Sequence, residues 1–240
     1  MDIRIGCSGF YNAHWKKIFY PEEMPRKDWL SFYCEKLNTL ELNNTFYKFP
    51  TLKTMSSWYQ RSPADFLFSV KAPKLITHLS RFNDCEQLME DFYSVCTEGL
   101  NEKLGCLLFQ LPPSIAYDEE KLQNIIRYIR PGFKNVIEFR HTSWWNEKVY
   151  NTLAGHDIIF CSVNHPKLPN TLVINSDKVY IRLHGNPEMF YSNYSTEFLN
   201  KLSQFILTKK NLKEIFIYFN NTASTSGVLN ALELREIFNI

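Results

Sequence analysis

The chain has 240 residues, 45% of them hydrophobic, and its formal net charge at pH 7 is +2. This length suits a single domain of α/β-barrel size, and the hydrophobic share is typical of a soluble protein with a large core. The charge is too small to indicate a nucleic-acid-binding surface. No apolar run is long enough to predict a membrane span.

Eight short apolar runs predict strands, and most of them end on a polar or charged residue. In chain order the runs are residues 3–8, 39–43, 66–71, 105–110, 135–140, 158–163, 179–184 and 215–220. Helical periodicity separates most of them. It is clearest over residues 29–37, 122–129, 198–206 and 228–238, with Asp118 as a predicted N-cap. Two segments interrupt the pattern: residues 164–177, which contain two prolines, and residues 185–194 after the seventh strand.

The repeated strand–helix alternation predicts a parallel sheet closed into a TIM (β/α)8 barrel, as a single domain over residues 1–240. One crossover, over residues 164–177, is expected to lack a regular helix, and residues 185–194 are expected to form a long loop. An open doubly wound sheet of eight strands is the structural alternative.

Six scattered cysteines, with no C-x-x-C pair, predict free buried thiols and neither a zinc site nor a disulfide framework. The first predicted strand begins at residue 3, so we expect no signal peptide before it. These features favour a reduced, cytoplasmic protein. No cofactor and no metal is expected, and the oligomeric state is not predicted.

The strand register separates a polar face from an apolar face, because residues two apart in a strand share a face. Polar pairs occur at Glu41 and Asn43, at Ser69 and Lys71, at Glu138 and Arg140, at Arg182 and His184, and at Tyr218 and Asn220. The helix-facing side of a barrel must be apolar, so these pairs are predicted to point into the lumen near the C-terminal strand ends. The alternative for each single residue is a structural ion pair, such as Glu138 with Arg182 or Glu41 with Arg140.

Motifs spread over almost the whole chain resemble the DUF72 (YecE-like) family. They include GCSGFY at residues 6–11, ELN at 41–43, FSVK at 68–71, QLPP at 110–113, EFRH at 138–141, RLHG at 182–185 and YFNN at 218–221. The resemblance implies a TIM barrel and brings no established activity. The chain departs from the family pattern at Thr222, where the family usually has Asp.

Cationic side chains outnumber carboxylates at the predicted strand ends, which favours a small anionic partner such as a phosphorylated or carboxylated sugar-like molecule. We therefore predict an enzyme of acid/base chemistry, with Glu138 as base, His184 as its proton partner and Glu41 as the second carboxylate. The predicted substrate contacts are Lys71, Arg140 and Arg182 as an anion clamp, the amides Asn43, Gln110, Asn220 and Asn221, and the aromatic residues Tyr11 and Trp15.

Two other functions remain open at this point. A metal-dependent hydrolase or phosphodiesterase would use Glu41, Glu138 and His184 as ligands, although Lys71 and Arg140 in the same ring would repel a cation. A non-catalytic ligand-binding protein would need the same anion clamp. The histidines His14, His156 and His165 fall in loops or near helix ends and are expected to be solvated surface residues.

Overall fold

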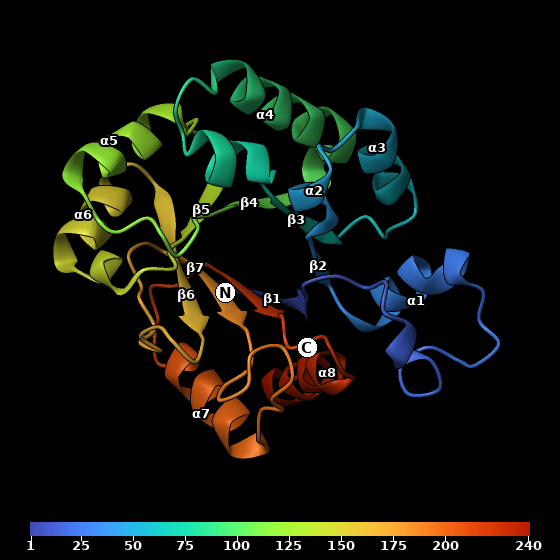
Figure 1. Ribbon diagram of the computed structural model, residues 1–240. Coiled ribbons are helices and arrows are strands. Elements are labelled where there is room, and N and C mark those ends of the chain that lie inside the picture. The colour runs from blue at the N-terminus through green and yellow to red at the C-terminus, as the bar shows by residue number, and fades with distance from the viewer.

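The computed structural model describes residues 1–240, in which eight parallel strands form a closed barrel surrounded by helices (Figure 1). The strands are β1 (Asp2–Cys7), β2 (Thr39–Leu42), β3 (Leu67–Lys71), β4 (Leu104–Gln110), β5 (Lys134–Glu138), β6 (Ile158–Asn164), β7 (Lys178–Leu183) and β8 (Glu214–Phe219). Each strand pairs with the next along the chain, and β8 pairs with β1 to close the barrel. The predicted barrel is confirmed, and the open doubly wound sheet was wrong.

Helices cover the outside of the barrel. They are α1 (Trp29–Lys36), α2 (Asn44–Tyr47), α3 (Leu52–Gln60), α4 (Glu86–Leu100), α5 (Glu119–Tyr128), α6 (Glu147–Gly155), α7 (Thr196–Leu207) and α8 (Ser226–Phe238). A π-helical segment, η3 (Leu75–Ser80), follows β3. The predicted N-cap of α5 is confirmed, since the Asp118 side chain accepts a hydrogen bond from the Lys121 backbone N–H. No helix is both long and apolar enough to cross a membrane.

The crossover between β6 and β7 contains no helix, as the prolines and the absence of helical periodicity predicted. Polar side chains hold this segment against the barrel instead. Asn175 accepts a hydrogen bond from the Phe160 N–H and donates one to the Ile158 carbonyl, while Ser162 Oγ bonds to both the N–H and the carbonyl of Val173. The segment's backbone therefore finds partners without forming a regular element.

The hydrophobic core has an outer part between strands and helices and an inner part within the barrel. The inner part consists of Cys106, Leu108, Val136, Ile159, Cys161, Val163, Leu168, Tyr180, Phe216 and Tyr218. All six cysteines are buried free thiols, as the sequence predicted. Apolar and tyrosine side chains thus occupy the lumen beneath the polar residues at the C-terminal strand ends.

Candidate functional site

The inward polar faces of several strands meet inside the barrel. Glu41 on β2, Glu138 on β5 and Arg182 on β7 are at most 1% exposed, and so is His184, which directly follows β7. Their neighbours in sequence point outward into the apolar core. The predicted strand register is therefore confirmed for these four residues, and it brings together side chains that are distant in the sequence.

Arg182 bridges the two buried carboxylates. Its Nη2 donates to Glu41 Oε1 at 2.6 Å and its Nε to Glu41 Oε2 at 3.0 Å, while its Nη1 donates to Glu138 Oε2 at 2.6 Å. Charge-assisted bonds of this kind are the strong ones in protein interiors. These two partners engage all three nitrogen atoms of the guanidinium. The guanidinium lies between the carboxylates, where a bound cation would otherwise lie.

Hydroxyl groups complete the hydrogen bonding of Glu41. Ser8 donates to Oε1 and Tyr180 to Oε2, both at 2.6 Å. Burying a carboxylate is costly unless its oxygen atoms are paired and hydrogen-bonded. Glu41 meets that condition entirely with protein groups.

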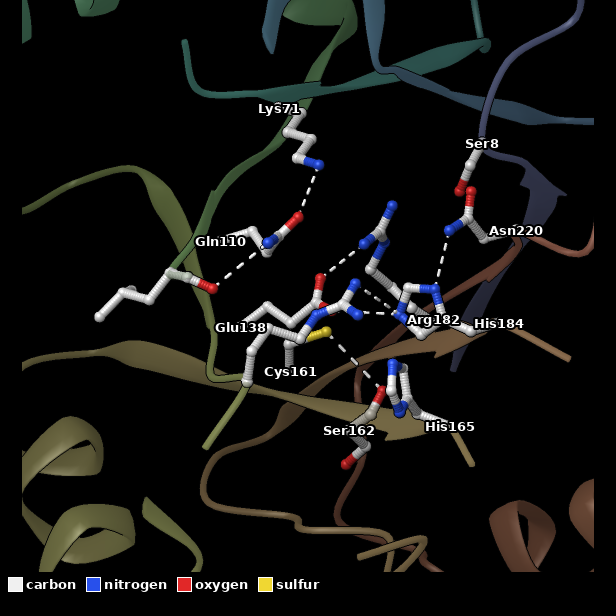
Figure 2. Close-up of polar contacts among 12 residues, drawn as sticks. Ser8, Lys71, Gln110, Glu138, Cys161, Ser162, His165, Arg182, His184 and Asn220 are labelled. Carbon is white, nitrogen blue, oxygen red and sulfur yellow. Dashed lines mark hydrogen bonds and ion pairs between the residues drawn. The ribbon is translucent and has the colours of Figure 1, made fainter. Parts of the chain in front are cut away.

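His184 lies between Glu138 and Asn220 (Figure 2). Its Nδ1 is 2.7 Å from the Asn220 amide nitrogen, which can only donate, so the hydrogen is assigned to Nε2, 3.1 Å from Glu138 Oε1. Burial lowers the pKa of His184 to about 3; Arg140 lowers it further, while Glu138 opposes the shift. His184 is therefore a neutral hydrogen-bond donor at physiological pH.

Glu138 also contacts Arg140, whose Nε lies 2.5 Å from Glu138 Oε1 in an ion pair. Burial by itself raises the pKa of Glu138, but Arg140 and Arg182 outweigh it and hold the pKa well below its ordinary value. Glu138 is a stable carboxylate with cations on two sides.

Lys71, the last residue of β3, is partly buried at the mouth of the barrel. Its Nζ donates to Gln110 Oε1 at 2.7 Å (Figure 2) and lies 4.2 Å from the centre of the Phe46 ring, but it makes no ion pair. Burial lowers the pKa of Lys71 to about 8, with a contribution from Arg182. The amine and ammonium forms are therefore both populated near neutral pH.

Several buried polar atoms on residues that follow the strands have no hydrogen-bond partner, among them Asn221 Oδ1, and two of these atoms concern the cluster described above. They are Asn43 Oδ1, directly after β2, and Arg140 Nε, which forms its ion pair with Glu138 without hydrogen-bond geometry. Unpaired buried polar groups are rare in native proteins and call for an explanation such as a ligand. One of these atoms is an acceptor and the other a donor.

The remaining predicted contacts lie apart from this cluster. Trp15 is fully buried, and its indole N–H donates to the Ser224 carbonyl. Tyr11 is 60% exposed and packs against Trp29. Asn221 is buried and donates to the Ser192 carbonyl, which supports the loop after β7. No hydrogen bond in the structure links these three residues to Glu138, Arg182 or His184.

His165 was expected to be a solvated surface residue, and that expectation was wrong. It directly follows β6, is 7% exposed, and its ring centre lies 5.6 Å from that of His184. Burial and then Arg140 lower its pKa to about 4. Its place two residues after a predicted strand was the signal that could have identified it.

The structure contains no group of three or more His, Cys, Asp or Glu side chains arranged to hold a metal ion. Glu138 and His184 are in contact, but Glu41 is separated from them by the Arg182 guanidinium. The Arg182 guanidinium thus occupies the space between the side chains that the hydrolase alternative requires as metal ligands.

A family model described as "Protein of unknown function DUF72" matches residues 4–240. The UPF0759 protein YunF of Bacillus subtilis is 24% identical over 272 residues, which covers 99% of this chain and 95% of that protein. The UPF0759 protein YecE of Escherichia coli K12 is 26% identical over 117 residues, 48% of this chain and 43% of its own.

Solved structures give the same similarity. A DUF72 family protein from Thermotoga maritima is 28% identical, has a TM-score of 0.90, and the match covers 100% of both chains. Another from Enterococcus faecalis V583 is 20% identical with a TM-score of 0.85, covering 99% of this chain and 96% of the other.

Proposed function

Because the chain belongs to the DUF72 family of proteins of unknown function, we propose its function from its own site: it is an enzyme that performs acid/base chemistry on a small anionic, sugar-like molecule at the C-terminal end of the barrel. The observation that carries this proposal is Lys71, a partly buried lysine with no carboxylate partner. In TIM-barrel enzymes the active site lies at this end of the barrel.

The charge balance of the site supports an anionic partner. Inside the barrel, Glu41 and Glu138 are matched by Arg182 and Arg140, and His184 is neutral. Lys71 is therefore the cation left over. A phosphate or carboxylate placed between Lys71 and the mostly buried Arg140 would offset that charge with charge-assisted hydrogen bonds.

In this proposal Lys71 takes over the proton transfer that the sequence assigned to Glu138 and His184. Glu138 and His184 are fully buried, and Glu138 is held as a carboxylate by two arginines. These properties favour a positioning role, in which Glu138 orients Arg140 through their ion pair and His184 orients Asn220. Lys71 is better suited to transfer protons, since an effective general acid or base has a pKa near the working pH.

Amide side chains at the mouth suit a hydroxylated molecule. Asn43 offers an unpaired acceptor. A hydrogen bond to His184 orients the Asn220 amide, and one to the Leu111 carbonyl orients the Gln110 amide. Oriented amides that also retain hydrogen-bonding capacity are typical contacts for sugar hydroxyls.

The test is a thermal-shift and turnover panel of phosphorylated and carboxylated sugars. Lys71→Met removes the charge and keeps the chain length, and Lys74→Met, at an exposed lysine three residues later, is the matched control. We expect at least one panel member to stabilise the wild type and Lys74→Met but not Lys71→Met. Its turnover should rise as the pH passes through about 8.

Equal stabilisation of Lys71→Met, or no stabilisation by any anionic member, would refute the proposed site. Stabilisation that depends on Lys71 but is never accompanied by turnover would refute the enzymatic part. That result would favour the ligand-binding alternative.

A further inference from the structure

The chain has two lysines with shielded ammonium groups, and their surroundings are opposite. Lys103 is 5% exposed, and its Nζ donates to the carbonyls of Tyr59 and Ser62, both at 2.7 Å, and to Ser62 Oγ at 3.2 Å. Its three N–H donors therefore have three acceptors. Lys71 Nζ has one acceptor, Gln110 Oε1, and otherwise faces the Phe46 ring. Unlike Lys103, Lys71 therefore lacks the acceptors that would hold its side chain as an ammonium group.

The charged groups around Lys71 reinforce this difference. Arg182 from β7 and Arg140 after β5 disfavour a third cation, while Glu41 and Glu138 favour it but are already engaged by guanidinium groups. His78 on η3 adds no further positive charge, because burial and the nearby Lys71 lower its pKa. An uncharged lysine amine is a nucleophile, whereas an ammonium is not.

The unpaired atoms near Lys71 indicate what the amine would meet. Leu42 pairs with Val70, and Asn43 and Lys71 directly follow these two residues, so the residue that carries the unpaired Oδ1 and Lys71 follow paired positions of neighbouring strands. A ligand that satisfies Asn43 Oδ1 needs a hydrogen-bond donor such as a hydroxyl group, and one that binds the Arg140 guanidinium needs an acceptor oxygen.

We propose that Lys71 is a nucleophile that forms a Schiff base with a hydroxy-aldehyde or hydroxy-ketone bearing a phosphate or carboxylate group. This inference rests on the proposed function and names its substrate class. The Asn43 amide oxygen accepts from the hydroxyl group, Arg140 binds the anionic group, and Lys71 Nζ attacks the carbonyl carbon.

The step is balanced without an external oxidant or reductant. The Nζ lone pair forms the C–N bond while the carbonyl π electrons move to oxygen, which takes the proton released by nitrogen. The resulting carbinolamine loses its hydroxyl group and the second nitrogen proton as water, leaving C=N. Uptake of one proton from solvent gives the iminium ion, in which the adjacent carbon becomes acidic and open to the proton transfers of the proposed function.

The experiment traps the Schiff base on the wild-type chain, so that no variant has to fold. The protein is incubated at about pH 8 with D-glyceraldehyde 3-phosphate and sodium cyanoborohydride, then digested and analysed by mass spectrometry. Hydride addition to the iminium carbon leaves a secondary amine, with a mass increase equal to the aldehyde minus one oxygen atom. Lys74 and Lys103 serve as exposed and buried reference lysines in the same digest.

We expect at least about tenfold more adduct at Lys71 than at Lys74, because burial lowers the pKa of Lys71 to about 8 and leaves a large share of it as the reactive amine at this pH. Two further arms test the ligand contacts: unphosphorylated glyceraldehyde lacks the anion, and propanal lacks both anion and hydroxyl. Labelling of Lys71 should fall in that order, and labelling of Lys74 should not follow it.

Labelling of Lys71 no greater than that of Lys74 would overturn the Schiff base, as would equal labelling of Lys71 by all three aldehydes. The two proposals fail separately. If stabilisation by anionic sugars depends on Lys71 but trapping fails, the proposed function stands without the Schiff base. If Lys71 is trapped selectively but no anionic sugar stabilises the protein, the nucleophile stands and the proposed function falls.

Discussion

Replacing Arg182 with Met should be among the most destabilising single changes in the polar cluster. The guanidinium is 1% exposed and bonds to two carboxylates that are themselves fully buried. Methionine is apolar and of similar length, so the change removes the charge while leaving most of the volume filled. The loss therefore reports on the ion pairs and not on a cavity.

The expected size follows from what each carboxylate retains. Breaking a buried ion pair costs about 3–5 kcal/mol. Glu138 keeps Arg140 and His184, whereas Glu41 keeps only the hydroxyls of Ser8 and Tyr180 and no cation. We therefore expect the cost of about one broken pair, roughly 4 kcal/mol, against a typical total of about 5–15 kcal/mol.

Urea denaturation followed by circular dichroism at pH 7 measures this cost as a change in the free energy of unfolding. Arg127→Met, at an exposed arginine on α5, is the control and should stay within about 0.5 kcal/mol of the wild type. Adding Glu41→Gln to Arg182→Met removes the uncompensated charge, and should recover about 2 kcal/mol. A loss below about 1 kcal/mol in Arg182→Met, or no recovery in the double variant, would show that these ion pairs do not set the stability of the cluster.

Three further changes test other parts of the structure by the same denaturation measurement. The folded-state pKa of His184, about 3, lies below its unfolded value of about 6.5, so its contribution to stability is complete above pH 6.5 and falls by about 1.4 kcal/mol per pH unit below it; His184→Asn should remove that part of the slope. Tyr180→Phe removes a donor to a buried carboxylate and should cost about 1–3 kcal/mol. Gly6→Ala places a Cβ 2.0 Å from a backbone oxygen of β2 and should cost about 3 kcal/mol or more, whereas Gly155→Ala meets nothing within 4 Å and should not destabilise.

The strands and their inward faces followed directly from the sequence. Every observed strand begins and ends within two residues of its prediction, and Glu41, Glu138 and Arg182 all point into the lumen. The reason is that successive side chains in a strand point to opposite faces, so an alternation of polar and apolar residues shows which face is buried. The crossover without a helix could be predicted for a similar reason, since proline disfavours a helix through its effect on the adjacent backbone.

Of the two ion pairs suggested by the sequence, Glu138 with Arg182 is confirmed, whereas Glu41 pairs with Arg182 and not with Arg140. Arg182 bonds to Glu41, 141 positions away in the sequence, and to Glu138, 44 positions away, and these carboxylates balance its charge. The sequence predicted cationic side chains at the strand ends but not which of them would remain unpaired. That outcome depends on the spacing of strands around the barrel, which no single strand encodes.

Protonation states likewise belong to the tertiary structure. His184 and His165 are neutral, and Lys71 has a pKa of about 8, because burial and neighbouring arginines disfavour their charged forms. The strands and the side chains on their inward faces could be predicted from the sequence, because both follow from local periodicity. Only the folded chain sets burial and the distances between charges, and these leave Lys71 as the cation of that ring without a carboxylate partner.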